Sequence, residues 1–277
     1  MQKLLVSKDL AKRELAKLKE ELESFNLEEK LRLGIIQVGD NPASNKYIQY
    51  KMKVAEQLGI QATLYKFADT ISQDQLLKKM DRINEKEDGI IVQLPLPEHI
   101  PTQVILDAVP YEKDIDGLTT KNAFRLYNET KDKHFIPATA RGVLELMEYY
   151  NIDVKDKKVC VVGRSAVVGK PLAHIIKRRG ANVSTYNETT GIKGIESGDI
   201  VIVAIGVAKY VKAENLKKGA IVIDVGTNLD NQLTADLCGD VDFDNVIDKV
   251  SAITPVPGGV GPMTVVALMK NLIDIIR

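Results

Sequence analysis

The sequence predicts an α/β protein made of two units, each a parallel sheet with helices packed against it. Three observations favour this class. The 277 residues exceed the usual length of a single domain. Short apolar runs alternate with segments of helical periodicity along most of the chain. A polar, irregular stretch at 119–137 interrupts this alternation near the middle. Alternating strands and helices are typical of parallel sheets, so we expect one sheet on each side of the interruption.

The first unit begins with an amphipathic helix. From Ser7, a residue type that often precedes a helix, apolar residues recur at helical spacing as far as Phe25 on a charged background. The strands that follow are short apolar runs bounded by glycine, asparagine or proline, and each intervening helix has one apolar face. We expect strands at 33–38, 61–67 and 89–94, with helices at 44–58 and 72–84.

The second unit repeats the alternation after a linking helix at 141–150. Strands are expected at 158–162, 182–185, 200–204 and 220–225, with a helix at 169–179. The last helix, at 262–276, opens with proline, whose missing N–H loses no hydrogen bond at an early helical position.

Composition excludes several classes of protein. The 38 Lys and Arg residues balance 38 Asp and Glu residues, which argues against a nucleic-acid partner, because binding phosphates needs a basic excess. The longest apolar run, 200–208, is far shorter than the ~20 residues of a membrane span, and the apolar start is too short for a signal peptide. Two cysteines and three scattered histidines form no disulfide framework or metal-ligand spacing. We therefore expect a cytoplasmic protein without a bound metal.

A lysine in the helix at 44–58 falls on an apolar stripe. Lys51 shares this stripe with Tyr47, Val54 and Leu58, whereas Lys53 falls on the charged side. A partly desolvated lysine can have a pKa near neutrality and then transfers protons usefully. On helical geometry alone the commoner outcome is a lysine that lays its stem on the core and keeps its amine in water.

Two other polar residues stand at places where ligands bind. Gln93 follows the apolar run 90–92 at the carboxyl end of a strand, where ligands gather in open α/β sheets. An amide satisfied by the backbone at the end of a strand fits equally well. Asp116 precedes Gly117 in a stretch that also suits a simple Asx turn. Neither residue is assigned a role by its position alone.

A glycine turn in the second unit suggests a phosphate site. Gly163, Arg164 and Ser165 follow a strand, and Gly169 opens a helix, which resembles the dinucleotide fingerprint with serine in place of its second glycine. Small residues allow the backbone to approach a pyrophosphate, which the helix N-terminus then holds. An ordinary strand–helix turn is the alternative. Arg164 suits the 2′-phosphate of NADP, whereas Glu188, about 20 residues further on, suits the ribose hydroxyls of NAD.

A loop rich in glycine and proline occupies 253–264. Its exposed amides lead into a helix N-terminus, so it is either a tight connection or one wall of a cleft between the two units.

Together these motifs closely resemble the bifunctional methylenetetrahydrofolate dehydrogenase/methenyltetrahydrofolate cyclohydrolase family. The strings that carry the resemblance follow in order at 38–51, 92–97, 113–119, 163–171, 223–226, 239–242 and 257–264. The resemblance implies NAD(P)-dependent oxidation of methylenetetrahydrofolate to methenyltetrahydrofolate, followed by hydrolysis to formyltetrahydrofolate. A cyclohydrolase with a weakened or lost dehydrogenase activity is the main alternative, and a non-catalytic folate-binding protein is another.

The resemblance also implies an architecture and an assembly. We expect a catalytic domain of residues 1–137 plus 262–277 and a Rossmann-like NAD(P)-binding domain of residues 138–261, with a folate cleft between them. The expected cofactor is NADP, with NAD not excluded, and the expected assembly is a homodimer.

The resemblance assigns roles to individual residues. Lys51 matches the catalytic lysine, assisted by Tyr47 and Gln93. Asp116 matches the carboxylate that anchors the pterin ring, and the other expected substrate-binding residues are Tyr47, Pro257, Gly258 and Gly259. The expected cofactor-binding residues are Gly163, Arg164, Ser165, Glu188 and Thr227.

Three departures from the family pattern bear on these expectations. The chain has Pro-Ala-Thr-Ala at 137–140 where the family commonly has Pro-Cys-Thr-Pro. Glu188 stands in a stretch that often reads His-Ser-Arg-Thr, and its carboxylate would repel a 2′-phosphate, so NAD stays open beside NADP. Residues 205–208, together with Thr227 in place of the usual isoleucine, change the surroundings of the expected cofactor site, which could alter dehydrogenase efficiency.

Overall fold

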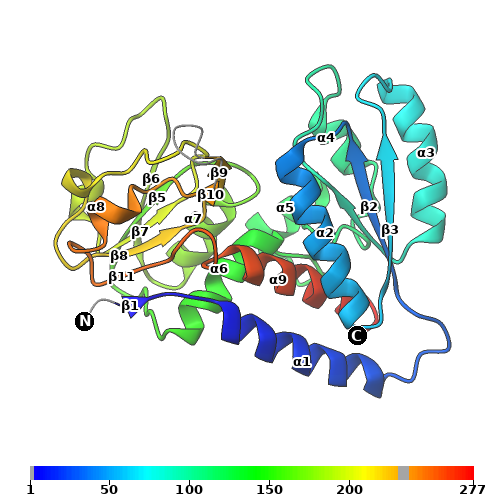
Figure 1. Cartoon of the computed structure of the whole chain (residues 1–277), viewed down its shortest axis with the longest axis horizontal. Helices are drawn as coiled ribbons and strands as arrows, with labels where there is room; N and C mark the ends of the chain where they lie inside the picture. Colours follow the sequence, from blue (N-terminus) through cyan, green and yellow to red (C-terminus); the bar gives the residue numbers. More distant parts are fainter. Residues whose placement is uncertain (1–2, 230–236) are drawn as a thin grey trace. The chain divides into compact units, whose positions relative to one another are not determined.

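The computed structural model describes residues 3–229 and 237–277, which form two compact units. Unit 1 comprises the chain up to Lys12 together with 139–264, and unit 2 comprises 13–138 and 265–277. The divisions fall within α1 (Lys8–Ser24), α6 (Ala138–Tyr149) and α9 (Gly261–Ile273) (Figure 1). The predicted fold class, two α/β domains with parallel sheets, is confirmed. The start of the chain clusters with unit 1, although we expected it in the catalytic domain; the functional domain boundaries themselves stay a prediction.

Unit 1 contains a six-stranded sheet in which every neighbouring pair is parallel. In spatial order the strands are β1 (Lys3–Leu4), β11 (Ala252–Ile253), β8 (Ile221–Asp224), β7 (Ile200–Val203), β5 (Lys158–Val162) and β6 (Asn182–Tyr186). The central strands are buried almost throughout, which explains their unbroken apolar runs. The chain runs from β5 to β6 on one side and then returns to β7 on the other, so the strand order reverses between β5 and β7. Ligands bind at such reversals in open α/β sheets.

Shorter elements complete unit 1. α7 (Gly169–Arg178) follows β5, and a small antiparallel pair joins β9 (Asn228–Leu229) to β10 (Leu237–Cys238). The remaining helices are η1 (Ile195–Ser197), η2 (Ala213–Asn215) and α8 (Phe243–Val246). Their apolar side chains pack with those of β5, β7 and β8 into one buried cluster. This core holds the carboxyl ends of the three strands in fixed positions.

Unit 2 is built on a parallel sheet of β3 (Gln61–Phe67), β2 (Arg32–Val38) and β4 (Gly89–Val92), in that order. Its helices are α2 (Pro42–Gln57), α3 (Gln73–Lys86), α4 (Thr102–Asp107) and α5 (Thr120–Tyr127). The carboxyl end of the central strand leads into the loop that opens α2 (Figure 1). The carboxyl end of β4 leads into the segment that contains Gln93.

Two glycines let helices approach the two faces of this sheet. A Cβ on Gly34 would lie 3.4 Å from Ile83 of α3, and a Cβ on Gly89 would lie 2.5 Å from Leu272 of α9. Gly89 pairs with Leu33, the neighbour of Gly34, and successive residues of a strand face opposite sides. α3 and α9 therefore cover opposite faces of the sheet.

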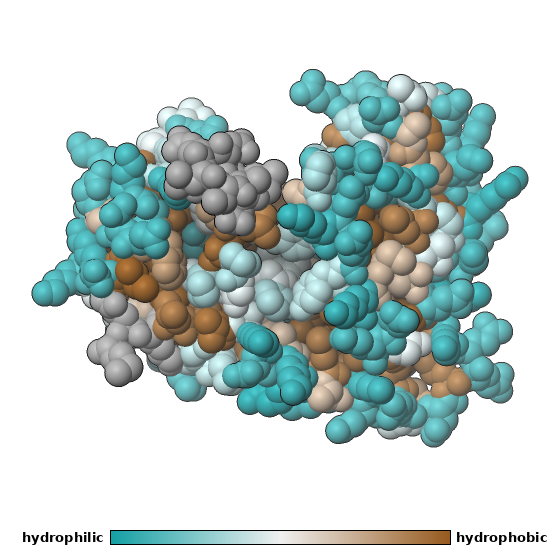
Figure 2. All heavy atoms as spheres, viewed as in Figure 1, coloured by the Kyte–Doolittle hydropathy of each residue, from teal (hydrophilic) through white to brown (hydrophobic). Residues whose placement is uncertain are grey.

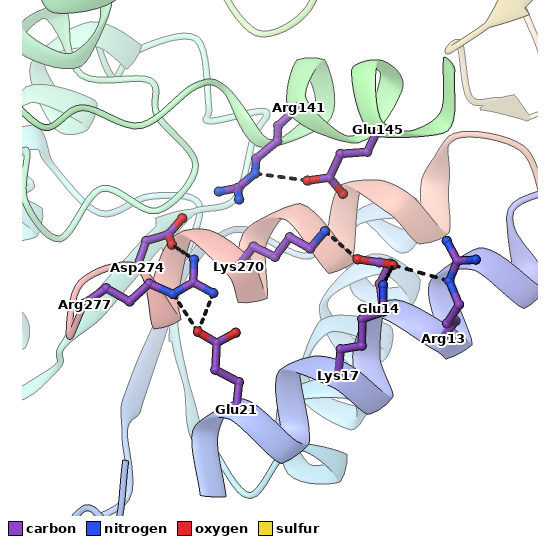
Figure 3. A network of polar contacts seen from close by, with 9 residues as sticks. All are labelled: Arg13, Glu14, Lys17, Glu21, Arg141, Glu145, Lys270, Asp274 and Arg277. Atoms are coloured by element: carbon purple, nitrogen blue, oxygen red, sulfur yellow. Dashed lines mark hydrogen bonds and ion pairs between the residues drawn. The ribbon is translucent and has the colours of Figure 1, made fainter. Parts of the chain in front are cut away.

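Ion pairs join α1 to α9 within unit 2 (Figure 3). Glu14 of α1 accepts hydrogen bonds of 2.9 Å from both Lys17 and Lys270, the latter on α9. Arg277, beyond the end of α9, donates through Nε to Glu21 at 2.6 Å. Burial favours the protonated form of Glu14, but the hydrogen bonds and charges of the two lysines outweigh it and lower the pKa of Glu14 to about 2.

Hydrophilic side chains dominate the face drawn in Figure 2, with smaller apolar patches. None of the helices in the described part of the chain has the length and apolar character needed to cross a membrane. No group of His, Cys, Asp and Glu side chains that could hold a metal ion occurs within 3–229 and 237–277.

The expected strands and helices are present, and the structure adds elements that periodicity does not predict. α5 lies within 119–137, which we expected to be irregular, so that expectation is wrong at 120–127. Thr119 caps this helix by accepting a hydrogen bond from the backbone N–H of Asn122. β1 and β11 have two residues each, too few to show an alternating pattern.

Candidate active site

Helix α2 carries Lys51 into the interior of unit 2. The side chain of Asn41 accepts a hydrogen bond from the backbone N–H of Ser44 at 3.0 Å, which caps the helix, and Pro42 opens it. Lys51 is only 6% exposed, so its amine is not extended into solvent as the commoner alternative required. Its Nζ donates to Oε1 of Gln93 at 2.9 Å. The structure thus brings together two residues that are 42 positions apart in the chain.

Asp116 supplies the opposite charge near this amine. Burial lowers the pKa of Lys51, and the negative charge of Asp116 opposes this effect. Burial likewise raises the pKa of Asp116 to about 6; the charge of Lys51 lowers that pKa, and the charge of Asp114 raises it. Asp116 keeps partial access to solvent although protein surrounds it. Burial therefore moves the pKa of each of the two groups toward neutrality, which suits proton transfer.

Asp114 holds the turn that presents Asp116. Its Oδ1 accepts from the backbone N–H of Gly117 at 3.0 Å. Its Oδ2 accepts from the backbone N–H of Thr119 at 2.7 Å and from Nδ2 of Asn122 at 2.9 Å. The turn is thus held by Asp114, three residues before Gly117, which sequence reasoning did not select, and not by the two-residue Asx turn that we considered for Asp116. The spacing of an aspartate three residues before a glycine is the signal that could have found it.

Tyr47 lies four residues before Lys51 on α2 and is partly buried. The pair follows the same stripe of the helix as Val54, which is buried. Unit 2 therefore contains four of the expected site residues, namely Tyr47, Lys51, Gln93 and Asp116. Among them, a buried amine, an amide and a carboxylate interact directly or through their charges.

The turn after β5 has the form of a cradle for phosphates. Gly163 has φ = +114°, and a Cβ there would lie 2.0 Å from the carbonyl oxygen of Ala204. A Cβ on Gly169 would lie 2.0 Å from the carbonyl oxygen of Gly163. Side chains at these two positions would collide with backbone, so only glycine lets strand, turn and helix come this close. The turn leads into α7 at the reversal of strand order, so the residues present fit a dinucleotide.

The two residues that favour different cofactors lie near one end of β6. Arg164 donates through Nε to the Thr185 hydroxyl at 3.1 Å and through Nη2 to the Thr185 carbonyl at 2.6 Å. The loop with Glu188 starts just beyond, and Oδ1 of Asn187 accepts from the N–H of Thr190 at 2.9 Å across it. Both Arg164 and Glu188 are exposed. The remaining expected cofactor residues also belong to unit 1, with Ser165 in the glycine turn and Thr227 just after β8.

The loop with Pro257, Gly258 and Gly259 belongs to unit 1. The carbonyl oxygen of Gly258 accepts from the backbone N–H of Ser7 at 3.0 Å and from its hydroxyl at 3.2 Å. Ser7 is fully buried. The loop is thus bound to the chain segment that precedes α1.

Known proteins match this chain along almost its whole length. A family model described as tetrahydrofolate dehydrogenase/cyclohydrolase, catalytic domain, matches residues 5–116, and the NAD(P)-binding domain of the same description matches residues 137–277. The chain belongs to this family. It is 58% identical to the bifunctional protein FolD of Mycoplasmopsis synoviae over 99% of this chain and 100% of that protein. It is 42% identical to the FolD protein of Bacillus cytotoxicus over 98% and 95% of the two chains.

Solved structures of the family have the same fold. The bifunctional FolD enzyme from Campylobacter jejuni superposes with a TM-score of 0.91 at 37% identity, covering 99% of this chain and 98% of that one. FolD from Trypanosoma brucei, solved with NADP cofactor and an inhibitor, gives a TM-score of 0.93 at 31% identity, covering 99% and 97%.

Membership of the family confirms the predicted function in folate one-carbon metabolism. The enzyme is a methylenetetrahydrofolate dehydrogenase and a methenyltetrahydrofolate cyclohydrolase, with an NAD(P)-binding domain and a folate derivative as the substrate. The comparisons give no support to the alternative of a cyclohydrolase alone.

Proposed function

We propose that Lys51 is the acid/base group of the cyclohydrolase reaction, assisted by Gln93 and Tyr47. One observation carries this proposal: the buried amine of Lys51 donates to Gln93 at 2.9 Å and faces the charge of Asp116. Because burial lowers the pKa of Lys51, the neutral amine is accessible nearer to physiological pH than it is for a lysine in water. A positioned group of this kind contributes about 10²–10⁴ to a rate.

Hydrolysis of the methenyl group needs a proton to be moved between two atoms. Water adds to the methenyl carbon and loses one proton, which leaves a hydroxyl group on that carbon. This hydroxyl then loses the second proton as the carbonyl of the formyl group forms and the bond from the carbon to one ring nitrogen breaks. The departing nitrogen takes up a proton, so that one proton is released overall. Lys51 in its neutral form accepts the proton of water at Nζ and returns it to the departing nitrogen. Gln93 accepts a hydrogen bond from Nζ of Lys51, and this bond orients the amine.

We assign Asp116 to substrate binding. The turn around it is held by three hydrogen bonds to Asp114, so its carboxylate is presented in a fixed position to accept N–H groups of a pterin ring. Tyr47 and the loop residues Pro257, Gly258 and Gly259 are the other groups that we assign to the folate. Their support is the resemblance of the motifs and, for Tyr47, its place one helical turn before Lys51.

We assign cofactor binding to Gly163, Arg164, Ser165, Glu188 and Thr227. NADP supplies, when bound, the acceptor for the hydride that leaves the one-carbon bridge of methylenetetrahydrofolate. The glycine turn leads into the start of α7, and a helix N-terminus is suited to hold the pyrophosphate. Arg164, held at the end of β6 by Thr185, is the group that we assign to the 2′-phosphate, and Glu188 opposes it by charge.

The assembly and the location belong to the same proposal. We infer a cytoplasmic homodimer with functional domains at 1–137 plus 262–277 and at 138–261. The family resemblance supports the dimer, and a chain with only two cysteines, Cys160 and Cys238, agrees with a reducing compartment. Sedimentation at micromolar concentration tests the dimer, and a monomer would contradict it.

The first experiment follows formation of reduced cofactor from methylenetetrahydrofolate, with NADP and NAD in parallel assays. Turnover with a preference for NADP is the expected result. A preference for NAD would show that Glu188 outweighs Arg164. If no reduced cofactor forms with either NADP or NAD while methenyl hydrolysis is intact, the assigned cofactor site is contradicted.

A further inference from the structure

Two buried aspartates lie at the carboxyl edge of the unit 1 sheet, outside the residues assigned above. Asp224 is the last residue of β8 and is 2% exposed, and Asp240 follows β10 and is fully buried. A carboxylate is seldom placed in such surroundings unless its oxygens are satisfied by donors. Both aspartates are satisfied mainly by backbone N–H groups of loops at this edge.

Asp240 binds the loop that follows β7. Its Oδ2 accepts from the backbone N–H of Ile205 at 2.7 Å and from that of Gly206 at 2.9 Å. Its Oδ1 accepts from Nδ2 of Asn228 at 2.8 Å. The backbone of the same segment is also paired, because Lys209 donates to the carbonyl of Gly239 at 3.1 Å. The side chain of Asp240 therefore holds the backbone just beyond β7.

Asp224 in turn determines where Asp240 lies. Its Oδ1 accepts from the backbone N–H of Asp240 at 3.0 Å, and its Oδ2 accepts from that of Val241 at 2.9 Å. A Cβ on Gly239 would lie 1.9 Å from Asp224, and one on Gly226 would lie 2.1 Å from Asp240. The packing leaves no space for side chains at these two glycines, so each aspartate packs directly against the backbone there.

The loop that Asp240 holds touches the glycine turn directly. A Cβ on Gly163 would lie 2.0 Å from the carbonyl oxygen of Ala204, the residue before Ile205. This contact lies between the ends of β5 and β7, where the strand order reverses. A movement of Ile205 and Gly206 would therefore change the backbone on which Gly163 rests, and Gly163 cannot adapt by moving toward Ala204.

We propose that Asp240 is a positioning residue for the dehydrogenase, which holds the loop at 204–206 against the glycine turn and so keeps the cofactor site in shape. The proposal rests on the assignment of the glycine turn to NADP binding made above. Asp240 acts through backbone amides and not through contact with the substrate. Its removal should weaken cofactor binding while methenyl hydrolysis, which needs no cofactor, continues at Lys51.

The chain offers a matched control at the opposite edge of the same sheet. Asp199 directly precedes β7, and its Oδ2 accepts from the backbone N–H of Lys158 at 2.8 Å. It also pairs with Lys217. Asp199 therefore holds backbone much as Asp240 does, but at the amino ends of the strands, away from the reversal that binds ligands. A variant at Asp199 reports the general effect of losing such a contact.

The test uses the full-length enzyme and the variants Asp240→Ala, Asp240→Asn and Asp199→Asn. NADP binding is measured by calorimetry without folate, and hydrogen exchange is measured for the peptide that covers 204–208. For Asp240→Ala we expect a rise in the Kd for NADP on the order of tenfold or more, because two backbone N–H groups lose a charged acceptor. Exchange at Ile205 and Gly206 should also become faster.

Asp240→Asn keeps one side-chain oxygen for the two N–H groups, and the amide of Asn228 can turn to accept from the new NH₂ group. We therefore expect it to recover most of the affinity. Asp199→Asn should leave the Kd for NADP unchanged. If Asp240→Ala loses methenyl hydrolysis as well, its fold has failed, and Asn228→Ala then carries the test with an expected rise in Kd of about threefold.

Unchanged affinity in Asp240→Ala, beside normal NADP binding by the unmodified enzyme, would overturn this inference alone. Unchanged hydrogen exchange at 204–208 would also overturn it, since the loop would then not depend on Asp240. Failure of the unmodified enzyme to bind NADP would instead overturn the proposed function, and this inference with it.

Discussion

Replacement of Lys51 by methionine is the sharpest perturbation of the site in unit 2. Methionine has a similar length and no charge, so it fills the same buried space. The substitution removes the donor that lies 2.9 Å from Gln93 and the positive charge that faces Asp116. We expect methenyl hydrolysis to fall by ~10²–10⁴, which corresponds to about 3–5 kcal/mol in the barrier. The pKa of Asp116 should rise further, because the charge of Lys51 lowers it in the unmodified enzyme.

The assay follows the loss of methenyltetrahydrofolate absorbance, with NADP binding measured on the same preparation. Lys53→Met is the control, because Lys53 lies on the same helix but is exposed. It should retain full hydrolysis. Hydrolysis by Lys51→Met within a few-fold of the unmodified rate would refute the assignment of the proton transfer to Lys51. Equal losses in the two variants would show that the effect comes from the helix and not from the amine.

Three further changes have expected outcomes. Burial raises the pKa of Asp116 to about 6, so its carboxylate form is lost as pH falls below that value; kcat/KM for hydrolysis should decline there, and a pH profile of Asp116→Asn should lack this limb. Glu14→Gln should lower the free energy of unfolding at pH 7 by roughly 1–2 kcal/mol after solvent screening. Glu14 has a pKa lowered from 4.5 to about 2, so its contribution is present above 4.5, and the difference measured by chemical denaturation should vanish as pH falls toward 2. Glu188→Ser should shift the ratio of kcat/KM for NADP and NAD toward NADP, and an unchanged ratio would remove Glu188 from the determinants of specificity.

Much of the fold follows from local pattern. The strands β5, β7 and β8 are buried on both faces, which explains why most of their residues are valine or isoleucine. α5 was missed because its buried residues include Asn122, whose amide is satisfied by Asp114 and by the carbonyl of Tyr111. A buried polar residue carries no apolar periodicity, so tertiary hydrogen bonds decided this helix.

In the candidate site, too, local pattern predicts some residues and not others. Local pattern indicates Lys51 from its stripe on α2 and Gln93 from its place after β4. Their contact arises because α2 follows β2, the strand that pairs with β4. The sequence gives little indication of the roles of Asp114 and Asp240. Their partners are mostly backbone N–H groups, which every residue type but proline has. A carboxylate that binds backbone can be recognised only when the path of the chain is known.

Asp114 and Asp240 bind backbone N–H groups in a similar way, one in each unit. Asp114 holds the turn of Asp116 in unit 2, and Asp240 holds the loop beside the glycine turn in unit 1. Asp224, the partner of Asp240, lowers stability: burial raises its pKa from 3.8 to about 7, although the backbone N–H groups of Val241 and Asp240 oppose this rise. A raised pKa means that stability present below pH 3.8 is lost as pH rises through 7, by about 4 kcal/mol for this shift. Apolar residues at this edge would give a more stable protein. The stability lost through Asp224 is explained if the loop at 204–206 must be held in a definite shape.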